Sequence, residues 1–261
     1  MVAPSHASET EAKGRGQQVS TFSPIVELRQ YTLHPHRRDA FIDLFDREFV
    51  ESQEALGIKV IGQFRDLDEP TRFVWLRGFA DMASRTAALT AFYDGPLWKS
   101  LRDSANASII DNDNVLLLRP AHPQAGFVLT QGARPAAGIQ GNGNGMVIAT
   151  VYHVDAAKET EFIDFFDAKV APELVKAGVT ILAELVSEHA VNTFGRLPVR
   201  EGEHVFVWFS RFPNLAAYER FKTALSQSPQ WRETIGAELT SRIREPQALK
   251  LSPTARSLLH D

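Results

Sequence analysis

Apolar and polar residues alternate over residues 25–33 (IVELRQYTL), a period that predicts a half-buried strand. Residues 36–56 carry apolar side chains at three- and four-residue spacing, typical of an amphipathic helix, and Gly57 stands where a helix commonly ends. Two strands, a second helical region and a closing strand are predicted over 58–64, 72–79, 81–107 and 114–120. The order β-α-β-β-α-β is that of a ferredoxin-like domain.

The same pattern occurs twice. FIDLFD (41–46) recurs as FIDFFD (162–167), which is 121 positions later, and FVWLRGF (73–79) recurs as FVWFSRF (206–212), which is 133 positions later. The shift therefore grows by 12 positions between the two matches, which locates an insertion in the second copy, in the Gly- and Pro-containing stretch 185–204. We interpret the chain as a tandem duplication.

This duplication predicts the domain organisation. We expect a disordered N-terminal arm (1–23), a first repeat (24–121), a flexible linker rich in Gly and Pro (122–145), a second repeat with the inserted loop 185–204 (146–253), and a tail (254–261). A ferredoxin-like unit covers only one face of its sheet with helices, so the other face needs a partner. The predicted fold is α+β: two tandem βαββαβ repeats packed sheet to sheet as an intramolecular α+β barrel, with a pocket between the sheets.

Charged residues accompany the aromatic residues in the first repeat. Alternation places Glu27, Arg29 and Tyr31 on one face of their strand, and Trp75 and Arg77 on one face of a neighbouring strand. If this face points into the barrel, the five side chains form a polar and aromatic cluster in an apolar cavity, as small-molecule sites do. We name Arg77, Arg29 and Glu27 as candidate catalytic residues, with Tyr31 and Trp75 binding substrate; a structural lattice of ion pairs is the alternative.

At the matching positions the second copy has Ile148, Thr150, Tyr152, Trp208 and Ser210. The aromatic residues are kept and the charged residues are not. The repeated aromatic residues are therefore interpreted as the seam between the half-barrels, and the charged residues of the first copy as the place to look for function.

Arg85 and Trp98, in the second helical region, complete the substrate-binding candidates. The second copy has Tyr218 and Trp231 at these positions, so packing is the alternative role for Trp98 and a salt bridge on a helix face is the alternative role for Arg85.

Bulk composition excludes several classes of partner and of binding site. The chain has 261 residues, a net charge of −4 and no cysteine, so we expect no nucleic-acid partner, no disulfide and no thiolate metal site. No apolar run is long enough to cross a bilayer and no secretory signal is visible, which predicts a cytoplasmic protein without a transmembrane segment. The histidines show no metal-ligand spacing, so no metal and no cofactor are predicted; haem on one axial histidine is the alternative.

The segments ELRQYTLHPHRRDAFIDLF, GIKVIGQF, FVWLRGFADMASRTAAL, GPLWKSLRDSAN and NVLLLRP resemble the NIPSNAP family. The resemblance covers about 25–120 well and 146–253 more loosely. It implies the dimeric α+β barrel superfamily, which includes cofactor-free monooxygenases and haem-degrading enzymes. Arg85 and Trp98 match an Arg and a Trp that recur in the family.

Two functions follow as hypotheses. The first is a small-molecule-binding barrel, with cofactor-independent monooxygenase-like or isomerase-like activity on an aromatic or apolar substrate. The second is a non-catalytic scaffold that binds protein partners through its helices, its sheet edges or the inserted loop, with a packed space between the sheets. A further homo-oligomer is compatible with either function.

Overall fold

The structure, a computed structural model, describes residues 23–129 and 134–260. The predicted disordered arm lies, apart from Ser23, outside the described residues. The first repeat contains β1 (Ile25–Leu33), α1 (Arg38–Leu44), α2 (Val50–Glu54), β2 (Lys59–Asp66), β3 (Arg72–Phe79), α3 (Met82–Asp94), α4 (Pro96–Asn106) and β4 (Ile109–Pro120). A π-helical turn, Phe45–Phe49, joins α1 to α2, so these elements form the single predicted helix.

The second repeat has the same order of elements. It contains β5 (Met146–Val154), α5 (Glu159–Phe165), α6 (Ala171–Lys176), β6 (Thr180–Ser187), β7 (Val205–Phe212), α7 (Leu215–Gln227), α8 (Gly236–Arg242) and β8 (Ile243–Pro253). A π-helical turn again joins α5 to α6, over Phe166–Val170. The inserted loop, predicted over 185–204, connects β6 to β7 and spans only residues 188–204, because β6 continues to Ser187.

Local sequence explains where the helices begin and end. The Asp81 carboxylate accepts a hydrogen bond from the Ser84 amide at 2.6 Å and caps α3, and Asn214 caps α7 in the same way. Gly57 and Gly178 follow the first helical region of each repeat with φ of +84° and +101°, backbone conformations that other residues adopt only with strain. Equivalent signals at equivalent positions make the two repeats fold alike.

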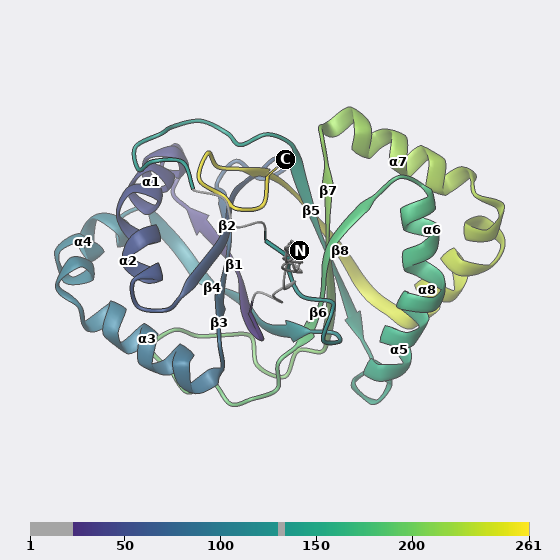
Figure 1. Cartoon of the computed structure of the whole chain (residues 1–261), viewed down its shortest axis with the longest axis horizontal. Helices are drawn as coiled ribbons and strands as arrows, with labels where there is room; N and C mark the ends of the chain where they lie inside the picture. Colours follow the sequence, from purple (N-terminus) through teal and green to yellow (C-terminus); the bar gives the residue numbers. More distant parts are fainter. Residues whose placement is uncertain (1–22, 130–133, 261) are drawn as a thin grey trace, which may run out of the picture.

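The eight strands close into one barrel in the order β1-β3-β2-β8-β5-β7-β6-β4. Each repeat contributes four neighbouring strands, and the two sets join where β2 pairs with β8 and β4 pairs with β6. The helices lie at the two outer ends of the molecule and the strands lie between them (Figure 1). The predicted intramolecular α+β barrel is confirmed.

Apolar side chains of both repeats fill the barrel interior. Val26, Leu28 and Val74 of the first repeat belong to one buried cluster with Val147 and Val207 of the second. Strand alternation therefore sends the other set of side chains, including Phe73, Trp75 and Phe79, outward against the helices. The interpretation of these aromatic residues as the seam between half-barrels is wrong, because backbone pairing of the strand edges makes that seam.

The linker and the tail pack against the barrel. Phe127, expected in a flexible tether, is 2% exposed and belongs to the barrel-interior cluster, where its ring lies 5.0 Å from that of Phe209. In the tail, the Arg256 side chain is buried and its guanidinium hydrogen-bonds the Asp46 carbonyl and the Glu51 carboxylate. These parts of the linker and tail are integral to the fold.

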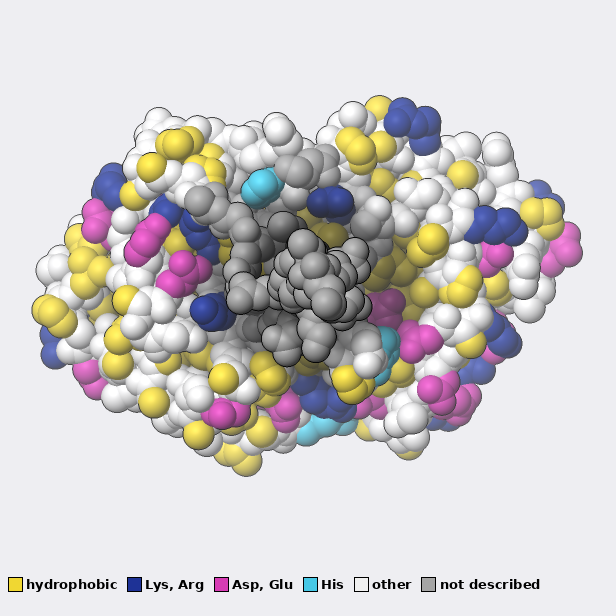
Figure 2. Space-filling view, viewed as in Figure 1, with side chains coloured by type: hydrophobic (Ala, Val, Ile, Leu, Met, Phe, Trp, Pro, Cys, Tyr) yellow, Lys and Arg dark blue, Asp and Glu magenta, His cyan; other side chains and the backbone are white. Residues whose placement is uncertain are grey.

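None of the helices in the described part of the chain has the length and apolar character needed to span a bilayer. On the face shown in Figure 2, acidic and basic side chains are interspersed outside the area that grey atoms cover. That visible surface offers nucleic acid no extended basic patch.

Candidate functional site

One carboxylate and three guanidinium groups meet beneath the helices of the first repeat. Oε2 of Glu27 lies 2.7 Å from Nη1 of Arg29 and 2.8 Å from Nε of Arg77. Oε1 of Glu27 lies 2.6 Å from Nε of Arg85. All four side chains are 0% exposed. We call these four residues the arginine cluster.

Two neighbouring strands and one helix build this cluster. Glu27 and Arg77 face each other across the β1–β3 ladder, as the sequence predicted for adjacent strands, and Arg85 reaches them from α3. The expected position between the two sheets is wrong. The cluster lies on the outer face of the first-repeat sheet, because the barrel interior takes the apolar residues of alternate strand positions, such as Leu28 and Leu76.

The arginine cluster carries an excess of positive charge. Burial raises the pKa of Glu27, but Arg77, Arg29 and Arg85 together hold it well below its ordinary value, so the carboxylate is ionised. Arginine stays protonated in proteins, so three positive charges surround one negative charge. In each arginine of the cluster Nη2 is buried without a hydrogen-bond partner among the described residues. Such uncompensated buried charge is costly and attracts an anion.

Aromatic rings separate the arginine cluster from a small cavity. This inner cavity has a volume of about 60 Å³ and lies between the sheet and the helices of the first repeat. Tyr31 and Trp75 line it, and the guanidinium carbon of Arg29 lies 5.4 Å and 5.7 Å from the centres of their rings. Nε of Arg29 also donates a hydrogen bond to the Tyr31 hydroxyl at 3.1 Å. The sequence-predicted combination of Tyr31 and Trp75 with the charged residues is therefore present.

Gln53 and Tyr93 are two of the lining residues that were not predicted from the sequence. Gln53 accepts a hydrogen bond from Nη1 of Arg77 at 3.3 Å, and its side chain lines the inner cavity. Burial raises the pKa of the Tyr93 phenol, which also lines the cavity, and the nearby Arg77 lowers it. Gln53 is a polar residue close to the apolar stripe of a helix, the one sequence signal that could have marked it.

A second, outer hollow of about 210 Å³ adjoins the inner cavity and shares Tyr93 and Trp98 with it. The inserted loop of the second repeat forms part of its wall through Phe194 and Leu197. The Phe194 ring stacks on that of Tyr93, with ring centres 5.9 Å apart. The second repeat therefore completes the candidate site of the first.

The inserted loop also contacts the arginine cluster directly. Nη1 of Arg85 donates a hydrogen bond to Oδ1 of Asn192 at 3.0 Å. Arg85 is thus placed within the cluster, as an ion-pair partner of Glu27, and not among the residues that line the inner cavity. The alternative expected for Arg85 was a salt bridge on a helix face. Arg85 does form a salt bridge from α3, but its partner, Glu27, lies on the sheet.

Trp98 lies where the two spaces meet. Its ring contacts those of Phe49, Phe92 and Tyr93 at centroid distances of 5.6, 5.8 and 4.9 Å. The side chain both packs and lines the two spaces, so packing and ligand binding are compatible roles.

The corresponding region of the second repeat carries no such charge. Ile148 and Ser210 face each other where Glu27 and Arg77 do in the first repeat, and Thr150 pairs with Trp208. A larger hollow of about 600 Å³ lies beside α5 and α8, where Nη1 of Arg242 pairs with Oε1 of Glu161 at 2.6 Å. We therefore place the candidate site in the first repeat.

The arginine cluster is suited to an anion and unsuited to a cation or a haem. Three guanidinium groups repel metal ions, and no histidine is among the residues that line the inner cavity or the outer hollow. Histidines lie close to carboxylates elsewhere: His189 and His204 with Glu159 at the base of the inserted loop, and His122 with Asp167 and Glu184.

Comparisons with known proteins agree with the observed fold. Residues 26–123 match the family model of NIPSNAP. A candidate monooxygenase from Lactobacillus acidophilus NCFM has a similar structure, with a TM-score of 0.55 and 14% sequence identity over 89% of this chain and 94% of that one. An anthrone oxidase-like protein gives a TM-score of 0.55 and 15% identity over 90% and 95%.

A candidate monooxygenase from Fusobacterium nucleatum also gives a TM-score of 0.55, with 12% identity over 88% and 92% of the two chains. No curated protein matches the chain. At these identities the structural likeness concerns the fold. Residues 26–123, which are most of the first repeat, thus match the NIPSNAP family, and about nine-tenths of the chain shares its fold with these three proteins.

Proposed function

We propose that the first repeat binds a small aromatic or apolar compound that carries a negatively charged oxygen, and that the chain acts on it as a cofactor-independent monooxygenase-like or isomerase-like enzyme. The observation that supports this most strongly is the excess of guanidinium groups over carboxylates at a fully buried position beside an aromatic-walled cavity. An anionic ligand oxygen would compensate that charge.

Arg77 and Arg29 are the residues we propose to stabilise developing charge. A substrate that loses a proton next to a carbonyl or phenol becomes an enolate or phenolate, and preorganised donors in a water-poor site stabilise that oxyanion strongly. Both guanidinium groups lie against Trp75, with their central carbons 5.0 and 5.7 Å from the ring centre, so a single ring that lines the cavity stands between them and it. The names of the structural neighbours, two candidate monooxygenases and an anthrone oxidase-like protein, are in keeping with such chemistry.

Glu27 has a positioning role in this proposal. Both of its oxygens are occupied by arginines and its pKa is lowered, so it is a weak base with no free lone pair directed at a substrate. Its carboxylate holds three guanidinium groups in place.

The volumes of the inner cavity and the outer hollow limit the size of the substrate. A volume of about 60 Å³ holds a carboxylate or a few water molecules but not a benzene ring, for which a cavity of about 150 Å³ is known to suffice. The outer hollow adds about 210 Å³ on the other side of Trp98 and Tyr93. We therefore propose a monocyclic substrate whose anionic end enters the inner cavity while its ring displaces Trp98.

Matched probes test the proposal. Benzoate, benzamide and benzylamine have similar shapes and carry a negative, a neutral and a positive group. We expect benzoate to bind with a dissociation constant at least tenfold lower than the other two, measured by calorimetry, and to lose this preference in Arg77→Ser, which carries the second-repeat residue. Equal binding of benzoate and benzamide, or an unchanged preference in Arg77→Ser, would count against an anion site.

Partner binding is the second candidate function, and two observations favour it. The barrel interior is packed, as that hypothesis requires, and Val191 on the inserted loop is 77% exposed. The test is affinity capture of partners with the unmodified chain and with Val191→Ser: a partner recovered with the first and lost with the second supports it. Recovery of no protein partner from native lysate counts against it.

A further inference from the structure

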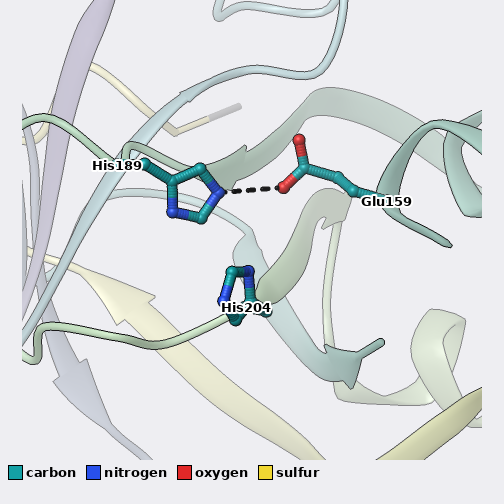
Figure 3. A group of neighbouring side chains, drawn as sticks. All are labelled: Glu159, His189 and His204. Atoms are coloured by element: carbon teal, nitrogen blue, oxygen red, sulfur yellow. Dashed lines mark hydrogen bonds and ion pairs between the residues drawn. The ribbon is translucent and has the colours of Figure 1, made fainter. Parts of the chain in front are cut away.

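Two histidines and one glutamate meet at the base of the inserted loop. His189 lies two residues after the end of β6, His204 lies directly before β7, and Glu159 is the first residue of α5. Their side chains point toward one another from the two ends of the inserted loop and from α5 (Figure 3). Their spacing along the chain, 15 and 30 residues, matches no metal-binding motif, so this group cannot be predicted from the sequence alone.

The distances suit a metal ion. One potential ligand atom from each residue lies within 4.8 Å of the other two, and Nε2 of His189 is 3.4 Å from Oε2 of Glu159. Two ligands of a tetrahedral zinc ion, each about 2.1 Å from the metal, lie roughly 3.4 Å apart. The first pair is already at that separation, and His204 needs to close by at most about 1.4 Å, within reach of a small side-chain rotation.

The surroundings hold the carboxylate in place and leave room for a further ligand. Nη2 of Arg119 contacts the other oxygen of Glu159, Oε1, at 2.6 Å, which orients Oε2 toward the histidines. A cavity of about 280 Å³ borders His189, so a water molecule can reach an open coordination position. Three protein ligands with one open position is the arrangement of catalytic and hydrated zinc sites.

We propose that Glu159, His189 and His204 form a binding site for one divalent transition-metal ion of the zinc class. Two imidazoles and a carboxylate are ligands that zinc, nickel and cobalt share, and they select against magnesium and calcium, which prefer oxygen ligands alone. The ion fastens both ends of the inserted loop to α5. This site is separate from the proposed substrate site, since none of its residues lines the inner cavity or the outer hollow.

A nearby group of similar composition provides the control. His122, Asp167 and Glu184 also lie within 4.8 Å of one another, but that group has one histidine and two carboxylates. Burial, together with the neighbouring Asp167, raises the pKa of Glu184 to about 8, so at neutral pH a proton occupies the position that a metal would need. We expect His122→Ala to leave zinc binding unchanged.

The test is equilibrium dialysis of the full chain, stripped of metal with a chelator, against zinc chloride. We expect one zinc ion per chain at micromolar free zinc, and a loss of affinity of roughly tenfold or more in His189→Ala and in His204→Ala. Glu159→Gln keeps the shape of the side chain and a contact with Arg119 but removes the charge, and should weaken binding as well. The visible absorption of bound Co²⁺ gives an independent reading and should disappear in the same variants.

The inference fails in either of two cases. In the first, the unmodified chain takes up no zinc at micromolar concentration. In the second, His189→Ala and His204→Ala, both shown to be folded by circular dichroism, bind zinc as tightly as the unmodified chain or as His122→Ala.

Discussion

The two repeats have the same backbone fold but enclose different sets of side chains between sheet and helices. In the first, Glu27 and Arg77 face each other across two strands; in the second, Ile148 and Ser210 do so at the matching register. Both repeats keep the Tyr and Trp beside these positions, and Trp75 and Trp208 are both buried. The second repeat shows that this fold is stable with apolar and small residues where the first has charges. The charges therefore need an explanation beyond folding.

The free-energy cost of burying charged groups strengthens the contrast between the two repeats. Removing ions from water costs several kcal/mol each, and a buried ion network often contributes no more stability than apolar residues of the same volume. The first repeat bears that cost for three guanidinium groups and one carboxylate, all 0% exposed. An anion-binding role accounts for the cost, and the second repeat serves as an internal control for each prediction below.

Glu27→Gln gives the largest expected effect. The variant leaves three buried guanidinium groups without their carboxylate, so we expect the free energy of unfolding to fall by about 3–5 kcal/mol. Urea denaturation followed by circular dichroism measures it. The matched variant in the second repeat, Ile148→Val, should cost only about 1 kcal/mol. Similar losses for the two variants would show that the charge of Glu27 is unimportant.

The next test replaces the charged residues of the first repeat with their counterparts in the second repeat. The combined variant Glu27→Ile, Arg29→Thr, Arg77→Ser and Arg85→Tyr carries the second-repeat residues at all four positions. We expect it to remain folded, with stability unchanged or increased, because the whole ionic network is removed at once. Benzoate affinity should fall by about 100-fold, or roughly 2.7 kcal/mol. Retained affinity would mean that the cluster is structural.

The repeats also differ at Gln63 and Glu184, which occupy matching positions on β2 and β6. Gln63 donates a hydrogen bond to Asp46 at 3.1 Å, whereas Glu184 stands beside Asp167, and burial raises its pKa from 4.5 to about 8. Between these two values the unfolded chain loses the Glu184 proton and the folded chain keeps it, so the folded state loses stability as pH rises from 4.5 to 8.

Glu184→Gln removes this pH-dependent penalty. We expect the variant to gain about 2 kcal/mol over the unmodified chain between pH 5 and pH 8, with no gain below pH 4.5. Gln63→Glu, which introduces a carboxylate beside Asp46, should show the opposite trend. Thermal unfolding across this pH range checks both variants, and a gain for Glu184→Gln that is independent of pH would contradict the assignment.

The smallest expected effect concerns the outer hollow. Arg196 lines it and pairs with Asp94 at 2.7 Å, with both side chains more than half exposed. Such a pair contributes little, so Arg196→Ala should change the unfolding free energy by no more than about 0.5 kcal/mol. Because it removes a positive charge from the entrance, we expect benzoate to associate more slowly, measured by stopped flow at low salt. Lys222→Ala, an exposed cation of the second repeat, should leave the rate unchanged.

Much of the fold was predictable because the signals are local. Strand alternation, the helical stripes, the glycines at 57 and 178 and the duplication together predicted the element order and the α+β barrel. Alternation also grouped Glu27, Arg29 and Arg77 correctly. It could not tell which face of the sheet points into the barrel, because both faces are buried, one by the other repeat and one by helices.

The remaining features depend on contacts between distant segments. Phe127 was expected in a flexible linker, and only the closed barrel shows that its ring is enclosed. Asn192 reaches Arg85 because the insertion of one repeat folds over the other. Glu159 is brought to His189 and His204 because α5 packs beside the two ends of the inserted loop, so the spacing of the three residues along the chain does not predict the group.

A crystal structure of the full chain with benzoate tests the central claim most directly. The account predicts the carboxylate in the inner cavity, with the Tyr31 or Trp75 ring shifted so that an oxygen lies about 3 Å from a guanidinium nitrogen of Arg77 or Arg29, and the benzoate ring beside a displaced Trp98. Benzoate bound only elsewhere, or an inner cavity closed to it at saturating concentration, would contradict the account.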